Sequence, residues 1–196
     1  NELPIRIKNH RTPNSFFIEV DSSLDLDEEG YRLSINSDNS VEINSLSYAG
    51  LFYGYQTFRQ ICDPEIESER GLISTSIPCL EIIDEPEFGY RGMHLDVSRH
   101  FFDVDFIKTY IDMIALHKMN VFHWHLTDDN GWRIEIDKYP LLTEKSAWRV
   151  DRTSEPWKEQ SPIKENEEAT YGGYYTKEEI REVVNYAASK LSLIHI

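Results

Sequence analysis

Two histidines and two adjacent aspartates lie within seven residues of the chain, in the stretch HWHLTDD that begins at His123. The residues around them favour a β-strand. Burying ionisable groups costs free energy unless the groups are paired or used. The four side chains His123, His125, Asp128 and Asp129 are therefore candidates for metal binding, proton transfer or sugar recognition, with packing as the structural alternative.

The histidine pair admits a metal-binding interpretation. Strand alternation places His123 and His125 on one face, and it places Phe122, Trp124 and Leu126 on the other. Two imidazoles at positions i and i+2 resemble half of a metal site, as a metal-dependent barrel hydrolase would use. Two ligands do not complete a site, and the sequence shows no further cluster of ligands. We therefore expect hydrogen-bonded core histidines, with no metal and no other cofactor.

The two aspartates suggest an acid and base pair, but their spacing argues against it. Neighbours on a strand point to opposite faces, so Asp128 and Asp129 cannot both flank one bond. A retaining glycosidase pair needs carboxyl groups about 5 Å apart on opposite sides of that bond. We expect one of the two to face the site and the other to cap a turn at Asn130 and Gly131.

An arginine follows the preceding strand at the corresponding place. Arg99 lies beyond the end of the strand, where its planar fork could bind two adjacent hydroxyls or a carboxylate. A salt bridge to Asp96 or Asp103 is the structural alternative. Arg91 lies at the start of the same strand and is expected to serve stability, and His100 is expected to be structural.

Residues 1–85 predict a small α+β domain. Residues 31–36 and 40–44 alternate apolar and polar side chains around the turn SDN, which predicts a hairpin. Residues 77–86 predict the last strand of this domain. Two cysteines, Cys62 and Cys79, are too few for a disulfide scaffold, and two unpaired buried thiols are expected, with one bridge as the alternative.

A helix is expected between the hairpin and the last strand. Its apolar residues recur at helical spacing, at Leu51, Tyr55, Phe58 and Cys62. Gly50 and Gly54 lie one turn apart, and glycine lowers helix stability. The pair therefore indicates that the helix closely approaches a sheet.

Residues 86–196 predict parallel β/α elements. Residues 90–97 and 120–126 are strand-like, and the helix between them begins near Asp103 or Asp105 as its N-cap. We expect Lys118 to complement the helix dipole and Asn120 to take the left-handed cap. The apolar face of this helix comprises Phe106, Ile107, Tyr110, Ile111, Ile114, Ala115 and Met119.

A second helix and a third strand are expected towards the end of the chain. Thr176 and Glu179 have capping-box spacing, and the buried face comprises Ile180, Val183, Val184 and Ala187. Residues 149–175 are polar, and a loop of that length is functional or disordered in most proteins. Two strands and part of a third cannot bury both faces of a parallel sheet, so we expect a truncated domain.

The composition excludes some partners. Lys and Arg number 20 against 35 Asp and Glu, a net charge of −15, which argues against binding nucleic acid. No apolar run approaches the roughly 20 residues of a membrane span. A neutral sugar remains compatible with this charge.

Four motifs resemble the family 20 glycoside hydrolases, the β-N-acetylhexosaminidases. They are GYRGMHLDVSRHFF, HKMNVFHWHLTDDNGWRIEI, YPLLTEKSAWR and YGGYYTKEEIREVVNYAA, and EEGYRLSI, AGLFYGYQTFRQ and IPCLEIIDEPEFGYRG resemble the accessory domain of that family. The resemblance implies an α/β fold: a small α+β accessory domain followed by the first strands and helices of a truncated TIM (β/α)8 barrel.

The resemblance also implies a role for two residues. Arg99 matches the arginine that hydrogen-bonds O3 and O4 of the terminal sugar, and Asp128 matches the aspartate that pairs with a histidine in a relay toward the catalytic acid. His123 and His125 match positions expected to be structural. The implied reaction releases a terminal β-linked N-acetylhexosamine from glycans, chitooligosaccharides or glycoconjugates, with the substrate's acetamido oxygen as nucleophile and an oxazolinium intermediate.

The sequence departs from the family pattern in its last part. The Gly-Gly-Asp-Glu stretch, which supplies the acid and the acetamido-orienting aspartate, is absent, and Gly172-Gly173 is followed by Tyr174. We therefore expect an enzyme fragment that is inactive by itself. A non-catalytic carbohydrate-binding protein remains an alternative, and the substrate class leads us to expect an extracellular or periplasmic location.

Overall fold

The computed structural model describes residues 12–64, 77–156, 164–190 and 193–195. The chain divides into two compact units, Asn1–Gly89 and Tyr90–Ile196. The domain boundary expected at residue 86 lies just before this division. Among the described residues, no helix is both long enough and apolar enough to cross a membrane.

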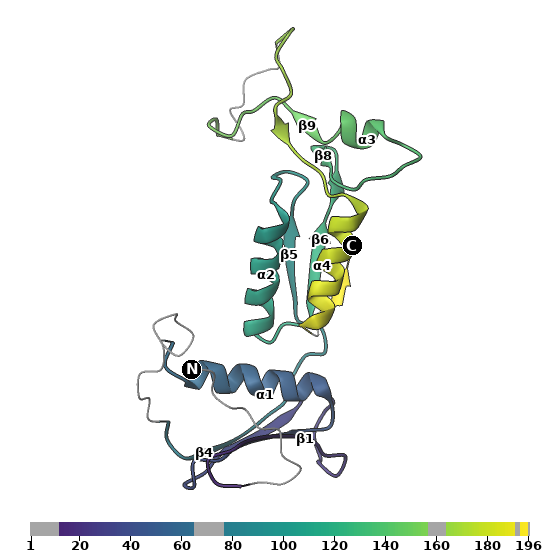
Figure 1. Cartoon of the computed structure of the whole chain (residues 1–196). Helices are drawn as coiled ribbons and strands as arrows, with labels where there is room; N and C mark the ends of the chain where they lie inside the picture. The colour runs from purple at the N-terminus through teal and green to yellow at the C-terminus, as the bar shows by residue number, and fades with distance from the viewer. Residues whose placement is uncertain (1–11, 65–76, 157–163, 191–192, 196) are drawn as a thin grey trace. The chain divides into compact units, whose positions relative to one another are not determined.

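The first unit contains a four-stranded sheet with strand order β1-β3-β2-β4 (Figure 1). Strands β2 (Tyr31–Ile35) and β3 (Val41–Ser45) are antiparallel, which confirms the predicted hairpin. Strand β4 (Leu80–Asp84) pairs with β2 and confirms the expected last strand. Strand β1 (Phe16–Val20) runs parallel to β3 at the edge of the sheet.

Helix α1 (Tyr48–Ile61) packs directly on this sheet. A Cβ atom added at Gly50 would lie 2.0 Å from Oγ of Ser45, and one added at Gly54 would lie 2.5 Å from Cγ2 of Ile43. Both distances are far shorter than a van der Waals contact. The predicted close approach of helix and sheet is therefore confirmed.

The first unit departs from expectation in its thiols. Cys62 and Cys79 are not joined by a disulfide bond, as expected, but Cys79 is exposed rather than buried. Tyr55, one of the apolar residues at helical spacing, is 45% exposed, and its ring meets the edge-strand residue Phe16 in an edge-on contact at 6.3 Å between centroids.

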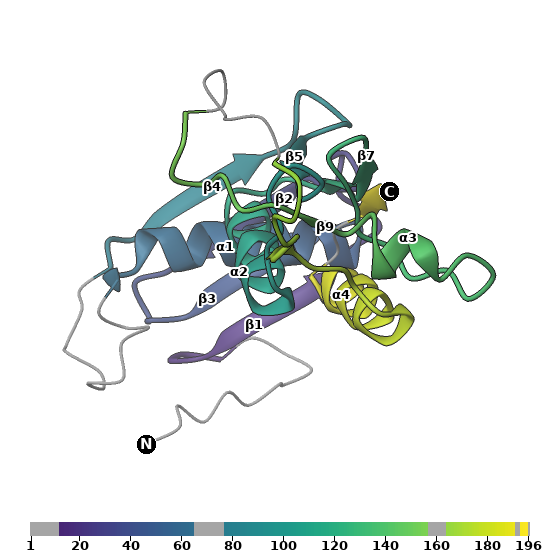
Figure 2. The same cartoon turned by 90° about the horizontal axis from the view of Figure 1, so that it is seen from above.

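The second unit contains a three-stranded parallel sheet with strand order β11-β6-β5. Its strands are β5 (Gly92–Asp96), β6 (Val121–His125) and β11 (Leu193–His195). Helices α2 (Val104–Leu116) and α4 (Lys177–Ser189) lie side by side against one face, as Figures 1 and 2 show. The alternating strands and helices agree with the start of a β/α barrel.

The core of the second unit forms between that face and the helices. Phe122 and Trp124 of β6 are fully buried against α2 and α4. His123 and His125, which alternate with them, lie on the opposite face, as the strand pattern predicts. Within α2 and α4 the expected apolar faces are largely buried, but Phe106 and Val184 are 41% and 39% exposed at the margins.

The helix caps follow the sequence closely, with one exception. Asp103 caps α2, where its carboxylate accepts a hydrogen bond from the Phe106 amide at 2.8 Å, and Thr176 and Glu179 form the predicted capping box of α4. The left-handed residue after α2 is Lys118 (φ 57°), not Asn120. The Asn120 side chain is buried and accepts a hydrogen bond from the Arg91 amide, so it ties the start of β6 to the start of β5.

Short pieces of structure connect these elements. They are the hairpin of β7 (Thr127–Asp128) and β8 (Gly131–Trp132), helix α3 (Leu141–Glu144), and the antiparallel pair β9 (Trp148–Arg149) and β10 (Tyr171–Gly172). The polar segment 149–175 therefore has its two ends paired, and its residues 157–163 lie outside the described part of the chain.

Candidate active site

Arg99 and Asp128 meet beyond the carboxyl ends of the two neighbouring strands β5 and β6. Arg99 follows β5 in the turn after Asp96, and Asp128 follows β6 at the base of the β7-β8 hairpin. Nη1 of Arg99 lies 2.6 Å from Oδ2 of Asp128. Arg91 lies at the other end of β5, where its Nε donates a hydrogen bond to the Lys118 carbonyl. The site therefore occupies the end of the strands at which β/α barrels bind substrates.

Three further side chains surround the Arg99 guanidinium. Nη1 also contacts Oδ2 of Asp96 at 2.9 Å, Nε donates to Oδ1 of Asn130 at 3.1 Å, and Nη2 lies 3.8 Å from Oδ1 of Asp129. The salt bridge to Asp96, which the sequence offered as the structural alternative, exists together with the contact to Asp128. The Arg99 side chain is nevertheless 39% exposed, so part of its fork faces solvent.

The two aspartates of the hairpin have different surroundings, as their adjacency predicts. Asp128 is 30% exposed and pairs with Arg99, whereas the side chain of Asp129 is 80% exposed. Asp129 and Asn130 are the two residues between the paired positions Asp128 and Gly131. Asn130, which the sequence indicated only as a turn residue, contributes its side-chain oxygen to the site.

The turn after β5 is fixed by Asp96. Its Oδ1 accepts hydrogen bonds from the amides of Ser98 and Arg99, at 3.0 and 3.1 Å. Oγ of the buried Ser98 donates to the Gly131 carbonyl at 2.8 Å. The loop that carries Arg99 and the hairpin that carries Asp128 are therefore connected directly.

The electrostatics of the site keep both carboxylates ionised. The pKa of Asp128 is lowered to about 2. The largest cause is the hydrogen bond from the Asp129 amide, and a hydrogen bond from His125 and the charge of Arg99 act in the same direction. Burial raises the pKa of Asp96, but hydrogen bonds from Arg99 and its charge outweigh burial and leave that pKa below its ordinary value. Both groups act as hydrogen-bond acceptors at neutral pH.

His125 reaches the same site, whereas His123 does not. Nε2 of His125 lies 2.9 Å from Oδ2 of Asp128 and 3.2 Å from Nη1 of Arg99. The structure adds a third imidazole, His94 on β5, whose ring centroid lies 4.6 Å from that of His123. The sequence contained the signal for it, since His94 is two residues before Asp96 in the preceding strand, but pairing it with His123 requires the register of the two strands.

Arg133, which the sequence pattern does not single out, is buried and holds the backbone just before Arg99. Arg133 has no exposed surface, and its guanidinium donates to carbonyl groups of Val97, Ser98, Ala147 and Gly173. Burial lowers its pKa below the ordinary value for arginine. These bonds join the residues that immediately precede Arg99 to the β9-β10 region.

Arg149 and Tyr171 form a second group of residues, which contacts the backbone of Arg99. Nη2 of Arg149 donates to the Arg99 carbonyl, and the guanidinium of Arg149 lies over the Tyr171 ring at 5.0 Å. The Tyr171 hydroxyl shares a hydrogen bond with Nδ1 of His100. His100 thus has a structural partner in β10, which agrees with its expected structural role.

This arrangement suits vicinal hydroxyl groups. A hydroxyl donates one hydrogen bond and accepts others, so it pairs well where a guanidinium and carboxylates lie side by side. Arg99 supplies donors, and Asp96, Asp128 and Asp129 supply acceptors. The site combines the two kinds of partner that a sugar ring requires.

Comparisons with known proteins agree with this interpretation. The family model described as "Glycosyl hydrolase family 20, catalytic domain" matches residues 88–194, and that described as "Glycosyl hydrolase family 20, domain 2" matches residues 1–85. A β-hexosaminidase of Porphyromonas gingivalis is 43% identical over 189 residues, which cover 96% of this chain and 22% of the relative.

Solved structures show the same likeness. The chain matches an exo β-N-acetylglucosaminidase of Vibrio harveyi in complex with N-acetylglucosamine, with a TM-score of 0.74 and 38% identity, over 91% of this chain and 26% of that one. It matches an N-acetyl-β-hexosaminidase of Streptomyces plicatus with a TM-score of 0.76 and 37% identity, over 91% of this chain and 32% of the other. The chain therefore spans about a fifth to a third of the length of these relatives.

Proposed function

Because the chain belongs to glycoside hydrolase family 20, we propose that it forms the front part of a retaining exo-β-N-acetylhexosaminidase. The observation that carries the proposal is the 2.6 Å contact between Arg99 and Asp128, beyond the ends of adjacent parallel strands. A donor and an acceptor at this place are suited to bind the hydroxyls of a sugar ring.

In this proposal Arg99 donates to O3 and O4 of a terminal N-acetylhexosamine. Asp96 and Asn130 hold the guanidinium by its Nη1 and Nε atoms, so Nη2 and the exposed edge remain for the sugar. Asp128 orients a histidine in the relay toward the catalytic acid. The acetamido oxygen of the substrate attacks the anomeric carbon, and the oxazolinium intermediate that forms preserves the configuration.

The substrate class is inferred from membership of the family. We propose terminal β-linked N-acetylglucosamine or N-acetylgalactosamine on glycans, chitooligosaccharides or glycoconjugates. The relative from Vibrio harveyi that is named a diacetylchitobiase, 37% identical over 166 residues, supports this class. Substrates of this kind support an extracellular or periplasmic location.

A chimera tests the proposal with a complete active site. The 189 matching residues of the Porphyromonas gingivalis relative are replaced by those of this chain, and hydrolysis of an aryl N-acetyl-β-glucosaminide is measured. We expect an active enzyme that a chelator does not inhibit, which separates it from a metal-dependent hydrolase. Arg99→Met should reduce kcat/KM by about 10²-fold or more, because hydrogen bonds from a charged group to the substrate are lost.

The matched control is Arg181→Met on the surface of α4, where Arg181 forms an ion pair with the exposed Glu178. Both variants replace an arginine by a methionine, so they lose the same charge and the same side-chain volume. An Arg99→Met chimera that stays folded and retains kcat/KM within twofold of the unmodified chimera would contradict the role of Arg99.

A further inference from the structure

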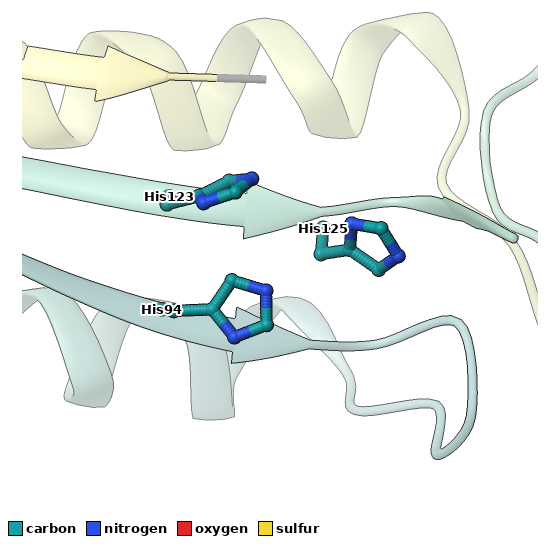
Figure 3. A group of neighbouring side chains, drawn as sticks. All are labelled: His94, His123 and His125. Atoms are coloured by element: carbon teal, nitrogen blue, oxygen red, sulfur yellow. The ribbon is translucent and has the colours of Figure 1, made fainter.

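Three imidazoles gather on the face of the β5-β6 sheet opposite the helices. His94 on β5 is in register with His123 on β6, and His125 follows two residues later on the same face. Figure 3 shows the three rings near one another, one carried by β5 and two by β6. Among the residues that the structure describes, these are the side chains that form a group of three possible metal ligands.

The spacing of the rings is close to that of a metal site. Ring centroids lie 4.6 Å apart for His94 and His123, and 5.6 Å apart for His94 and His125. One ligand nitrogen from each ring lies within 4.8 Å of the others. Tetrahedral Zn²⁺ with bonds of about 2.0–2.1 Å holds its ligand nitrogens roughly 3.3 Å apart. Rotations of the side chains can close this difference, since the strand backbones already hold the Cβ atoms in place.

Asp128 contacts one ring nitrogen of His125. Its Oδ2 lies 2.9 Å from Nε2, so the tautomer with the proton on Nε2 donates to Asp128 and leaves Nδ1 unprotonated for a metal. A histidine that donates its other ring N–H to a carboxylate is the usual outer-shell arrangement of metal-bound histidine.

The surrounding charge is compatible with a divalent cation. Arg99 lies near His125, but it contacts the Nε2 side of the ring at 3.2 Å and is offset by Asp96 and Asp128. The chain carries a net charge of −15, which raises the local concentration of cations. In the 196-residue chain His94 is exposed and the other two rings are half-buried, so ions of the titrated solution can reach the group.

We propose that His94, His123 and His125 bind one transition-metal ion of the Zn²⁺ class through three imidazole nitrogens, with water in the fourth position. Neutral imidazole suits zinc and its neighbours Ni²⁺ and Cu²⁺, and three histidines with an open fourth position form a known zinc geometry. The group adjoins the sugar-binding residues Arg99 and Asp128 through His125, and the proposed hydrolysis does not require a metal.

Calorimetric titration of Zn²⁺ into the chelator-treated 196-residue chain, purified without a polyhistidine tag, tests this proposal. We expect one equivalent to bind at pH 7.5. Co²⁺ in place of Zn²⁺ should give the visible absorption of a four-coordinate complex. Each single change His94→Ala, His123→Ala and His125→Ala should weaken binding at least about 100-fold, and Asp128→Asn about 10-fold through His125.

A histidine outside the group serves as the control. His117→Ala removes an exposed residue at the end of α2. This variant should bind Zn²⁺ as the unmodified chain does, and circular dichroism should show every variant folded. Absence of stoichiometric binding, full affinity in folded His94→Ala, or equal loss in His117→Ala would overturn the proposal.

Discussion

Nη1 of Arg99 lies 2.6 Å from Oδ2 of Asp128, and the same carboxylate oxygen lies 2.9 Å from Nε2 of His125. The other oxygen of Asp128 accepts the Asp129 amide. A carboxylate offers about four acceptor positions, so three are used and one remains. Asp128 can therefore hold its place beside Arg99 and still accept a hydrogen bond from a further imidazole, which is what a relay aspartate has to do.

The ionised state of Asp128 predicts acid sensitivity of the folded chain. Its pKa is about 2 in the folded state, below the ordinary 3.8, so its stabilising contribution is complete above about pH 4 and is lost as the pH falls toward 2. The lowered pKa of Asp96 acts in the same direction. We expect Asp128→Asn to lower the melting temperature at pH 7 and to have a smaller effect near pH 2, as measured by circular dichroism.

The control for this experiment is Asp25→Asn, which changes an exposed aspartate of the first unit. Its melting temperature should follow that of the unmodified chain at every pH. If Asp128→Asn lowered the melting temperature equally at pH 7 and pH 2, the ionised carboxylate would not be the source of the stabilisation.

The buried guanidinium of Arg133 predicts a large loss of stability on substitution. Arg133→Met removes the donor of hydrogen bonds to the carbonyls of Val97, Ser98, Ala147 and Gly173. Buried acceptors that lose a charged donor cost about 1–3 kcal/mol each, partly recovered through relaxation and the apolar side chain. We expect a loss of about 3 kcal/mol or more in the free energy of unfolding, measured by urea denaturation.

Arg181→Met provides the comparison for Arg133. Arg181 and Glu178 form an ion pair with both side chains more than half exposed, and such pairs contribute about 0–1 kcal/mol. Equal losses for the two variants would show that the hydrogen bonds of Arg133 contribute little to stability.

The local elements of this chain could be predicted because their signals lie within a few residues of each other. The hairpin around residues 37–39, the capping box of Thr176 and Glu179, and the close approach of Gly50 and Gly54 are all examples. The alternation that separates His123 from Trp124 belongs to the same class, since it depends only on the period of a strand.

The role of Arg133 could not be predicted in this way. Its partners are backbone carbonyls at positions 97, 98, 147 and 173, and any residue type supplies a carbonyl. The pairing of His94 with His123 likewise depends on the register between two strands separated by a helix. Both features arise from tertiary packing, which the sequence pattern of a single element does not contain.

The absence of the Gly-Gly-Asp-Glu stretch predicts that the 196-residue chain by itself has no hexosaminidase activity. Arg99 can bind a sugar, but no residue of the chain matches the acid that protonates the leaving oxygen. Purified chain should release no chromophore from an aryl N-acetyl-β-glucosaminide above a buffer blank, whereas the chimera with the Porphyromonas gingivalis relative does. If the purified chain released chromophore and its Arg99→Met variant did not, this prediction would be refuted.

The contact of α1 with its sheet predicts that Gly50→Ala destabilises the first unit, although alanine favours helices. The added Cβ would lie 2.0 Å from Oγ of Ser45 and 2.3 Å from the Gly30 carbonyl oxygen, which are hydrogen-bonded to each other at 2.6 Å. The Gly30 carbonyl belongs to the backbone and cannot rotate away from the added Cβ as a flexible side chain could, so α1 has to move away from the sheet. The cost of overpacking, about 1–3 kcal/mol or more, exceeds the gain of roughly 1 kcal/mol in helix propensity.

Amide hydrogen exchange in β2 and β3 measures this effect locally, without unfolding the second unit. We expect protection there to fall at least about tenfold in Gly50→Ala, which corresponds to about 1.4 kcal/mol. Gly89→Ala is the control, because a Cβ at Gly89 meets no atom within 4 Å. Unchanged protection in Gly50→Ala would mean that the helix adjusts at no cost, and the close approach would then not explain the glycine.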